Sequence, residues 1–499
     1  MKITFFQYRY GAVWVWVKNI YFRITFSKIT TFFFLFSFLY CLIHSLVQSF
    51  LYSYDHQADR MASSVVREAD VPQNEVSWLT RSDGIYTLKL CKHVPLTDTN
   101  ARDCKVIFRS DNSSLNIPPG YRRELDQSNS GSELVTANLT QTCTRVLSYA
   151  DQVLRNSRRE ELALIGSEFW AFGLSVFAVM YCSVPHLLAD FCMRFLSLVW
   201  SLYSIWRTLD IKQRFDVLIT NGACGHDLLP GYFEHRIAIQ IIDIVLNFIA
   251  FLLSIFFVWK LIKTYHRKTF NRIGAPPHVM RAYKVFLGVL TCLQVAIYFL
   301  VTGNALWIDQ LFNGPLAHIS SHNTEYIIGF TIINVLLLPW IAIGWFAIRL
   351  EMKRTMWTFL GLGAFYTCSW GFLYYSQVFR WTWIQWPFFA CMTLSAQIAE
   401  LACVILAVVC YKNFHKGLAQ YLHAESALAK DDFEPEVFTN DTESVPHRDS
   451  FEVNFKSISI YSDGASVSES KVDHDIKLIG DSRCWVFLRS FVGMNGTPK

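Results

Sequence analysis

The chain has 499 residues, of which 52% are hydrophobic, 16% are aromatic and only 17% are charged. This balance lies outside the range of soluble domains and predicts an all-α polytopic integral membrane protein. The formal net charge of +5 is small, and the basic residues collect in short loops beside apolar runs. We therefore interpret them as orientation signals and expect no nucleic-acid partner.

The first predicted transmembrane helix covers residues 30–52, and the segment before it, 1–29, is basic and rich in aromatic residues. Such a segment suits the cytoplasmic face of a lipid bilayer, where it contacts headgroups. A cleaved signal peptide would usually have a shorter leader and a shorter apolar core, so we expect a retained signal anchor. Cleavage, or a start at Met61, is the alternative.

Residues 53–162 are polar and predict one sizeable extracellular domain. The domain contains two glycosylation sequons, at Asn112 and Asn138, and we expect both asparagines to carry sugars. Accidental sequons are the alternative.

Four cysteines face the outside on this topology, namely Cys91, Cys104, Cys143 and Cys224. Four cysteines allow three pairings. We favour Cys91 with Cys104 and Cys143 with Cys224, since the second bond would tie the extracellular domain to the helix bundle. Free thiols in a loosely ordered loop are the alternative.

Residues 163–410 predict a seven-helix transmembrane bundle, which brings the expected total to eight transmembrane helices. Asp190 and Arg194 are expected near the tight inner turn between the first two helices of the bundle. This pair of helices is the least regular part of the prediction, because Arg207 and Arg214 then lie outside, against the positive-inside trend. The seven apolar runs are 164–185, 187–206, 237–259, 285–306, 326–348, 356–377 and 387–410.

The apolar run at 237–259 orients the whole chain. Only His235 and Arg236 flank its beginning, whereas a strongly basic loop starts at Lys260 behind its end. An excess of basic residues marks a cytoplasmic loop, so this helix runs from outside to inside. The same rule places the tail, 411–499, in the cytoplasm, and its acidic and serine-rich composition predicts that it is mostly disordered.

Polar side chains recur at helical spacing inside several predicted transmembrane helices. Because a carboxylate that faces lipid at mid-bilayer costs several kcal/mol, these stripes must face protein or water, and the bundle has a polar interior. The interior residues that we predict are Gln240, Asp243, Asn247, Gln294, Gln397 and Glu400.

Two interpretations of these stripes stay open. The residues form hydrogen bonds between neighbouring helices, or they line a path for a proton, cation or small solute with Asp243 and Glu400 as the titrating groups. No Lys or Arg is expected deep in any of the helices, which would leave both carboxyl groups to a proton or a bound cation.

No motif in the sequence predicts catalysis. His318 and His322 have the helical spacing of a metal pair but lack the glutamate of the metalloprotease motif, so a zinc-dependent hydrolase is a weak alternative. We find no phosphate-binding loop, nucleophile elbow or dinucleotide fingerprint in a credible context. We therefore expect a protein that is not an enzyme and has no cofactor.

Several continuous runs carry a resemblance to a known family. They are Trp206 to Phe215, Asn221 to Gly225, Leu229 to Tyr232, Trp307 to Gln310 and Asn413 to Leu418. The region that contains them, residues 160–425, resembles a family of multispan membrane proteins of basidiomycete fungi that extends to the smut-fungus tumour-cluster virulence membrane protein. The resemblance implies a plasma-membrane protein of growing hyphal tips with a role in host infection, and it carries over no catalytic residue.

The arrangement of an outer domain, a helix bundle and a cytoplasmic tail predicts a surface sensor or accessory component that works without catalysis. Its expected partners are the lipid bilayer and proteins that meet the outer domain or the tail. A transporter or channel that uses Asp243 and Glu400 is the alternative.

Overall fold

The computed structural model describes residues 21–25, 27–69, 75–95, 104–111, 140–273, 276–314 and 323–422. All of them belong to the compact unit Met1–Glu434, and the second unit, Pro435–Lys499, lies outside the described residues. The predicted glycosylation sites Asn112 and Asn138, the pair His318 and His322, and most of the predicted tail also lie outside them.

The described part of the chain is mostly helical, and seven of its helices are long and apolar enough to cross a membrane. This makes the chain a multi-pass membrane protein by length and composition. The seven are α2 (Lys28–Glu68), α4 (Gln141–Met180), α5 (Val184–Phe215) with its π-helical continuation η4 (Asp216–Ala223), α6 (Tyr232–Ile273), α7 (Pro277–Asn313), α8 (Asn323–Arg349) and α11 (Pro387–Lys412).

One further predicted transmembrane helix, 356–377, is present as the helix α9 (Lys353–Tyr375), but α9 is not among the seven apolar ones. Its apolar residues are interrupted by Gly361, Gly363, Thr367 and Ser369, which lower the mean hydropathy of the segment. The sequence predicts eight transmembrane helices, and seven of the described helices have the length and apolar character that this requires.

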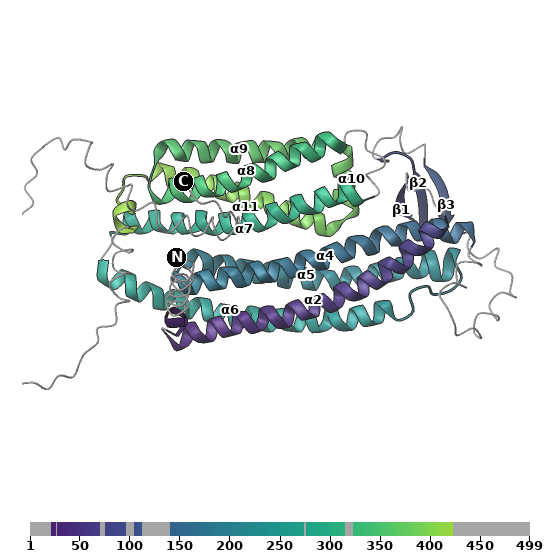
Figure 1. The fold of residues 1–499 in the computed structure, drawn as a ribbon, viewed down its shortest axis with the longest axis horizontal. Helices are drawn as coiled ribbons and strands as arrows, with labels where there is room; N and C mark the ends of the chain where they lie inside the picture. The colour runs from purple at the N-terminus through teal and green to yellow at the C-terminus, as the bar shows by residue number, and fades with distance from the viewer. Residues whose placement is uncertain are drawn as a thin grey trace, which may run out of the picture. The chain divides into compact units, whose positions relative to one another are not determined.

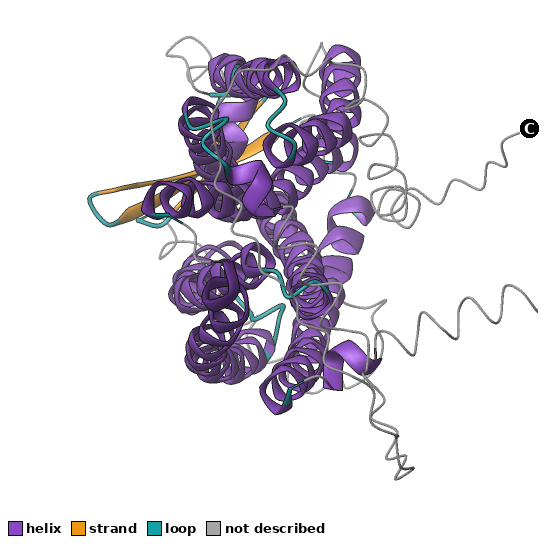
Figure 2. Cartoon of the chain, turned by 90° about the vertical axis from the view of Figure 1, so that its left-hand side faces the viewer, coloured by secondary structure: helices purple, strands orange, loops and turns teal. Residues whose placement is uncertain are grey.

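The long helices form two groups (Figure 1). In the first group α2 packs against α4 and α6, and α5 packs between α4 and α6. In the second group α7 and α9 both pack against α11, and α8 packs against α7 and α9. Contacts of α7 with α4 and α5 join the two groups. Figure 2 shows the helices nearly end-on.

The helices turn apolar side chains outward and polar side chains inward. On α6, Phe248, Ile249 and Leu252 are about half exposed, whereas Asp243 and Asn247 on the same helix are buried. A soluble protein rarely exposes continuous apolar surface of this extent, and a lipid bilayer is the solvent that suits it.

The helices α2 and α4 are longer than a bilayer requires. At about 1.5 Å per residue, 41 and 40 residues reach about 60 Å, roughly twice the hydrocarbon thickness. Their polar parts continue the apolar parts as one antiparallel pair, so the expected domain boundaries at residues 52 and 162 fall inside helices. We call the end of the bundle reached by Glu68 and Gln141 the outer end, following the orientation expected from the sequence.

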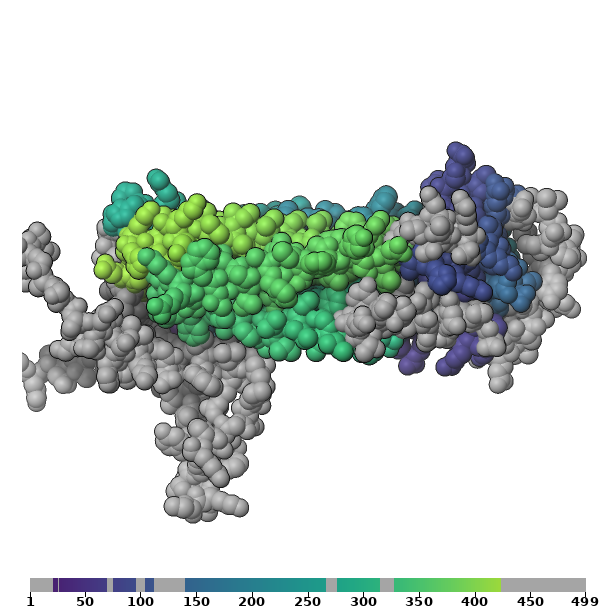
Figure 3. All heavy atoms as spheres, turned by 90° about the horizontal axis from the view of Figure 1, so that it is seen from above, coloured from purple at the N-terminus to yellow at the C-terminus, as the bar shows by residue number. Residues whose placement is uncertain are grey.

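A three-stranded antiparallel sheet lies at the outer end, where Figure 1 labels its strands, and Figure 3 shows the atoms of this region in dark blue at the end of the bundle. It consists of β1 (Val76–Ser82), β2 (Ile85–Cys91) and β3 (Lys105–Arg109), in that order. The hairpin between β1 and β2 turns at Asp83 and Gly84, both with positive φ, as a two-residue hairpin of this type requires. Leu88 and Phe108 are buried in a core that also contains residues of α2, α4 and α6.

Two disulfides hold the outer end together, and they are the two predicted pairs. Cys91 at the end of β2 is bonded to Cys104 just before β3. Cys143 in the first turn of α4 is bonded to Cys224, directly after η4, across 81 residues of sequence. The second bond ties the beginning of α4 to the loop before α6, as expected.

The path of α5 differs from the prediction. The sequence suggested a helix that ends near residue 206 and a loop at 207–235, but α5 continues to Phe215 and η4 to Ala223. The basic residues do not end the helix because acidic partners neutralise them: Arg207 pairs with Glu160 and Arg214 with Asp210. These pairs also explain why Arg207 and Arg214 are tolerated at the outer end, although the positive-inside trend disfavours basic residues there.

Candidate functional site

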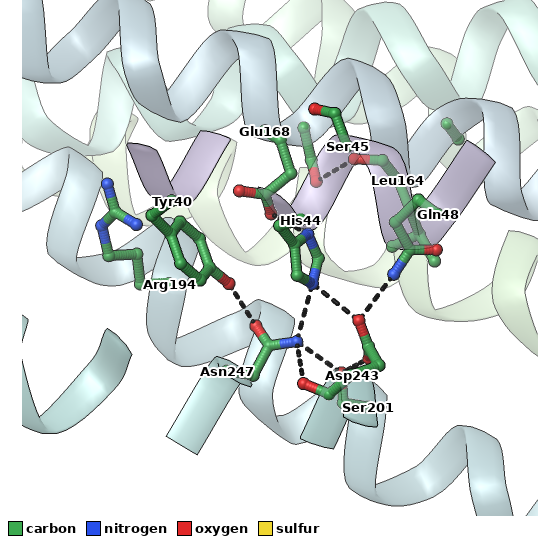
Figure 4. A network of polar contacts seen from close by, with 12 residues as sticks. Tyr40, His44, Ser45, Gln48, Leu164, Glu168, Arg194, Ser201, Asp243 and Asn247 are labelled. Carbon is green, nitrogen blue, oxygen red and sulfur yellow. Dashed lines mark hydrogen bonds and ion pairs between the residues drawn. The ribbon is translucent and has the colours of Figure 1, made fainter. Parts of the chain in front are cut away.

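The predicted polar stripe of α6 lies in the centre of the first helix group. Gln240, Asp243 and Asn247 are all buried and face α2, α4 and α5. Figure 4 shows side chains of α2 and α5 around Asp243 and Asn247 of α6, with Glu168 of α4 beside His44. We call the group Tyr40, His44, Gln48, Glu168, Asp190, Arg194, Ser201, Asp243 and Asn247 the central cluster.

Both carboxylate oxygens of Asp243 receive hydrogen bonds. Gln48 Nε2 donates to Oδ1 at 2.9 Å, and His44 Nε2 lies 2.7 Å from the same oxygen. Ser201 Oγ donates to Oδ2. The carboxylate is thus bonded directly to α2 and α5, so Asp243 links three helices.

His44 lies between two carboxyl groups. Its Nε2 faces Asp243, and its Nδ1 is 3.4 Å from Glu168 Oε1 on α4. The ring stacks on Tyr40 with centroids 5.2 Å apart, and the Tyr40 hydroxyl donates to Asn247 Oδ1 at 2.8 Å. A histidine in this position can carry one or two protons, and the second proton would be stabilised by both neighbours.

Arg194 is the basic residue of the central cluster, and it overturns the expectation that no Lys or Arg lies deep in a transmembrane helix. It is buried, its Nε donates to Asp190 Oδ2 at 3.2 Å, and its guanidinium lies 4.8 Å from the Tyr40 ring centroid. The sequence placed Asp190 and Arg194 near a turn. The turn comes earlier, since α4 ends at Met180, so Arg194 lies about 15 Å along α5.

A second group of buried charges lies nearer the outer end. Arg236 on α6 pairs with Asp55 on α2 and with Glu161 on α4, the latter at 2.9 Å. The Tyr232 hydroxyl also donates to Asp55, at 2.8 Å.

Arg207 on α5 completes this group. Its two terminal nitrogens donate hydrogen bonds to the two carboxylate oxygens of Glu160, at 2.5 and 2.7 Å. Trp386, at the start of α11, donates its indole N–H to the same carboxylate at 2.6 Å, so the contact reaches the second helix group. We call Asp55, Glu160, Glu161, Arg207, Tyr232 and Arg236 the outer cluster, and the two clusters together the buried network.

A small cavity separates the two clusters. Its volume is about 20 Å³, and its walls include Glu161 and Arg236 from one cluster and Gln48 and Asp243 from the other. Gln48 Oε1, Glu161 Oε2 and Gln240 Oε1, all from residues that line it, accept no hydrogen bond from the described residues. A cavity of this size and polarity suits one water molecule, which could donate to two of these oxygens.

The buried network contains more acidic than basic groups. Asp55, Glu160, Glu161, Glu168, Asp190 and Asp243 are all buried. Within the network they face three arginines and His44. Even with His44 protonated, two carboxyl groups have no basic partner of their own among the described residues of the network. An uncompensated buried charge is costly, so protons are expected to make up the difference.

The other predicted interior residues do not join this network. Glu400 on α11 accepts a hydrogen bond from Thr367 on α9 at 3.2 Å, and Gln397 accepts one from Tyr374 at 3.3 Å. Gln294 on α7 is buried, and its side-chain atoms have no hydrogen-bond partner among the described residues. Asp243 and Glu400 therefore lie in different helix groups and do not form one pair of titrating groups.

The polar stripe of α2 is not among the predicted interior residues. Tyr40, His44, Gln48, Asp55 and Asp59 follow one another at steps of four or seven residues and are all buried. This is the same helical periodicity that identifies the stripe on α6, but hydrophobicity alone predicts only a signal anchor for residues 30–52. Glu161 and Glu168, seven residues apart on α4, form a further stripe of this kind.

The described residues contain no group of three or more His, Cys, Asp or Glu side chains arranged to hold a metal ion. Comparison of the chain with models of known protein families, with curated proteins and with solved structures finds no match. The buried network therefore has to be interpreted from its own geometry.

Proposed function

We propose that the chain is a non-catalytic plasma-membrane sensor or accessory protein in which the buried network binds protons and thereby sets how α2, α4, α5 and α6 pack. The observation that carries this proposal is the excess of two carboxyl groups over basic groups in the network. A low-dielectric site favours taking up protons over keeping unpaired negative charges.

The position of the network supports a switch. Its direct hydrogen bonds join four helices, two of which continue into the outer end that carries the sheet. A proton gained or lost at His44 or Glu168 changes contacts between helices and not within one helix. Such a change can alter helix packing, and the change in packing can be transmitted between the outer end and the opposite end of the bundle.

A proton fits the central cluster better than a metal cation does. Asp243 already accepts hydrogen bonds from Gln48 and Ser201 and faces His44, so its oxygens are directed at donors. A cation would need several oxygen ligands directed at one point.

The resemblance to the basidiomycete membrane-protein family supports a location at the plasma membrane of hyphal tips and a role in host infection. On this proposal the protein partners meet the outer domain and the cytoplasmic tail.

The proposal is tested by thermal unfolding of the full chain in lipid nanodiscs over a series of pH values. The folded network keeps protons that the same carboxyl groups release when the chain unfolds, so the folded state binds more protons near neutral pH. Stability should then fall as the pH rises from about 6 to 8. Glu168→Gln removes one excess carboxyl group and should flatten this slope by up to about 1.4 kcal/mol per pH unit.

Two controls separate proton binding from a general loss of stability. Ser201→Ala removes a hydrogen bond to Asp243 without a change of charge, so it should lower stability but keep the slope. Glu68→Gln removes an exposed carboxyl group at the end of α2 and should change neither quantity. Equal slopes in wild type and Glu168→Gln would refute the proposal.

A second candidate is proton transfer across the bilayer. It is favoured by the length of the polar path, which runs from the ion pairs Asp151–Arg155 and Asp59–Arg158 near the outer end to Asp190 and Arg194. In sealed vesicles this function requires a proton flux in wild type that Asp243→Asn abolishes. A sensor alone gives no flux in either case.

A further inference from the structure

A pocket of about 70 Å³ opens between the outer ends of the four helices of the first group. Its walls are apolar where they are deepest. Ala62 comes from α2, Leu147 and Ala150 from α4, Phe215 from the end of α5 and Phe233 from the beginning of α6, and all five are buried.

The mouth of the pocket is acidic. Asp216, Asp227 and Glu234 line it, and Lys212 is the one basic side chain in its lining. Asp227 and Glu234 are exposed to solvent. A concave surface with apolar walls concentrates the field of such charges, so the mouth attracts cations.

Two aromatic rings form part of the apolar wall. Phe215 and Phe233 meet edge to face with ring centroids 5.4 Å apart, and both line the pocket. Such rings offer a large apolar surface to an alkyl group.

The walls of the pocket are held in place without a ligand. The disulfide between Cys143 and Cys224 fastens η4 to α4. Gly222 in η4 lies so close to the Phe108 ring of β3 that a Cβ atom there would be 2.8 Å from the ring. Asp227 Oδ1 accepts a hydrogen bond from the Leu229 backbone at 2.9 Å, which fixes the loop at the mouth. A π-helical turn beside a pocket is frequently part of a binding site.

We propose that this pocket binds a small organic ammonium ion at the outer end of the protein, with the alkyl group against Phe215 and Phe233 and the ammonium group at the acidic mouth. One water molecule needs about 10–15 Å³ of such space, so the pocket takes an alkyl group of roughly three to four carbon atoms. The proposal depends on the pocket alone and not on proton binding by the buried network.

The pocket also lies next to the outer cluster. Phe233 follows Tyr232, whose hydroxyl donates to Asp55, and Arg236 lies one turn further along α6. A ligand that shifts Phe233 would therefore act on the first two turns of α6, where Tyr232 and Arg236 bond Asp55 and Arg236 also bonds Glu161.

The test measures binding of n-butylamine to the full chain in lipid nanodiscs by calorimetry, with empty nanodiscs as the reference for partition into lipid. We expect saturable binding of n-butylammonium and at least tenfold weaker binding of 1-butanol, which has the same alkyl group without the charge. Glu234→Gln should weaken binding of the amine about three- to fivefold, since it removes one of the two exposed carboxylates that line the pocket. Ala62→Leu, which fills the pocket, should abolish binding.

Glu68→Gln is the matched control, because it makes the same chemical change on an exposed residue outside the pocket lining, and it should leave the affinity unchanged. Equal affinity for 1-butanol and n-butylamine would overturn the assignment of an ammonium site. Wild-type affinity in both Glu234→Gln and Ala62→Leu would overturn the location, and so would the absence of saturable binding in the wild type.

Discussion

Arg236 shows how single residues stabilise this bundle. Its guanidinium is buried, and two carboxylates from two other helices hold it, Asp55 from α2 and Glu161 from α4. Taking such a charge out of water is costly, and only its partners offset the cost. Removing Arg236 is therefore expected to lower the free energy of unfolding far more than removing one member of an exposed ion pair.

Arg236→Gln should destabilise the protein by about 3–5 kcal/mol, because Asp55 and Glu161 would remain buried without their basic partner. Chemical unfolding of the purified protein in detergent measures this loss. Arg214→Gln is the control, since Arg214 pairs with Asp210 but is 39% exposed, and such a pair contributes at most about 1 kcal/mol. Similar losses in the two variants would contradict the structural role given to Arg236.

The π-helical element η4 depends on its covalent connection to α4. Gly222 has non-helical backbone angles inside η4, and the Cys143–Cys224 bond follows directly after it. The bond closes a loop of 81 residues, whereas the bond between Cys91 and Cys104 closes only 13. A longer closed loop restricts the unfolded chain more strongly.

Removing the longer link with Cys143→Ser and Cys224→Ser should lower the free energy of unfolding by about 2–5 kcal/mol. Amide hydrogen exchange should increase locally in η4 and the loop before α6, while the apolar part of α6 keeps its protection. Cys91→Ser with Cys104→Ser serves as the comparison and should cost about 1–2 kcal/mol less. Exchange that increases uniformly along α6 would contradict the local role of the bond.

At the scale of the whole molecule, eight long helices lead the described chain from Lys28 to Lys412. The sequence predicts that all eight cross the membrane, and an even number of crossings would return the chain to its starting side, with the basic residues around Arg349, Lys353, Arg354 and Lys412 on that side. This predicted topology also assigns the sheet and the acidic pocket to the extracellular side.

An epitope tag after Lys499 should therefore be inaccessible to antibody on intact cells and should become accessible after permeabilisation. A tag inserted in the β1–β2 hairpin, next to Gly84, is the control and should be accessible on intact cells. Accessibility of the tail without permeabilisation would reverse the orientation, and with it the extracellular position of the sheet and the acidic pocket.

The apolar helical segments and the buried stripe of Gln240, Asp243 and Asn247 were predictable from the sequence, whereas the full lengths of α2, α4 and α5 were not. Hydrophobicity and helical periodicity are local properties that can be read along one segment. The sequence also favoured the two disulfide pairs, because the side of the membrane reduced the candidates to four cysteines.

The packing of the helices in three dimensions is what shows which buried polar stripes contact one another. It placed His44 and Gln48 of α2 against Asp243, brought Arg194 into the same cluster and kept Glu400 apart in the second helix group. These outcomes depend on the rotation and packing of helices that are separated by up to about 200 residues of sequence. No local pattern specifies such packing, because it results from many side chains on several helices fitting together at once.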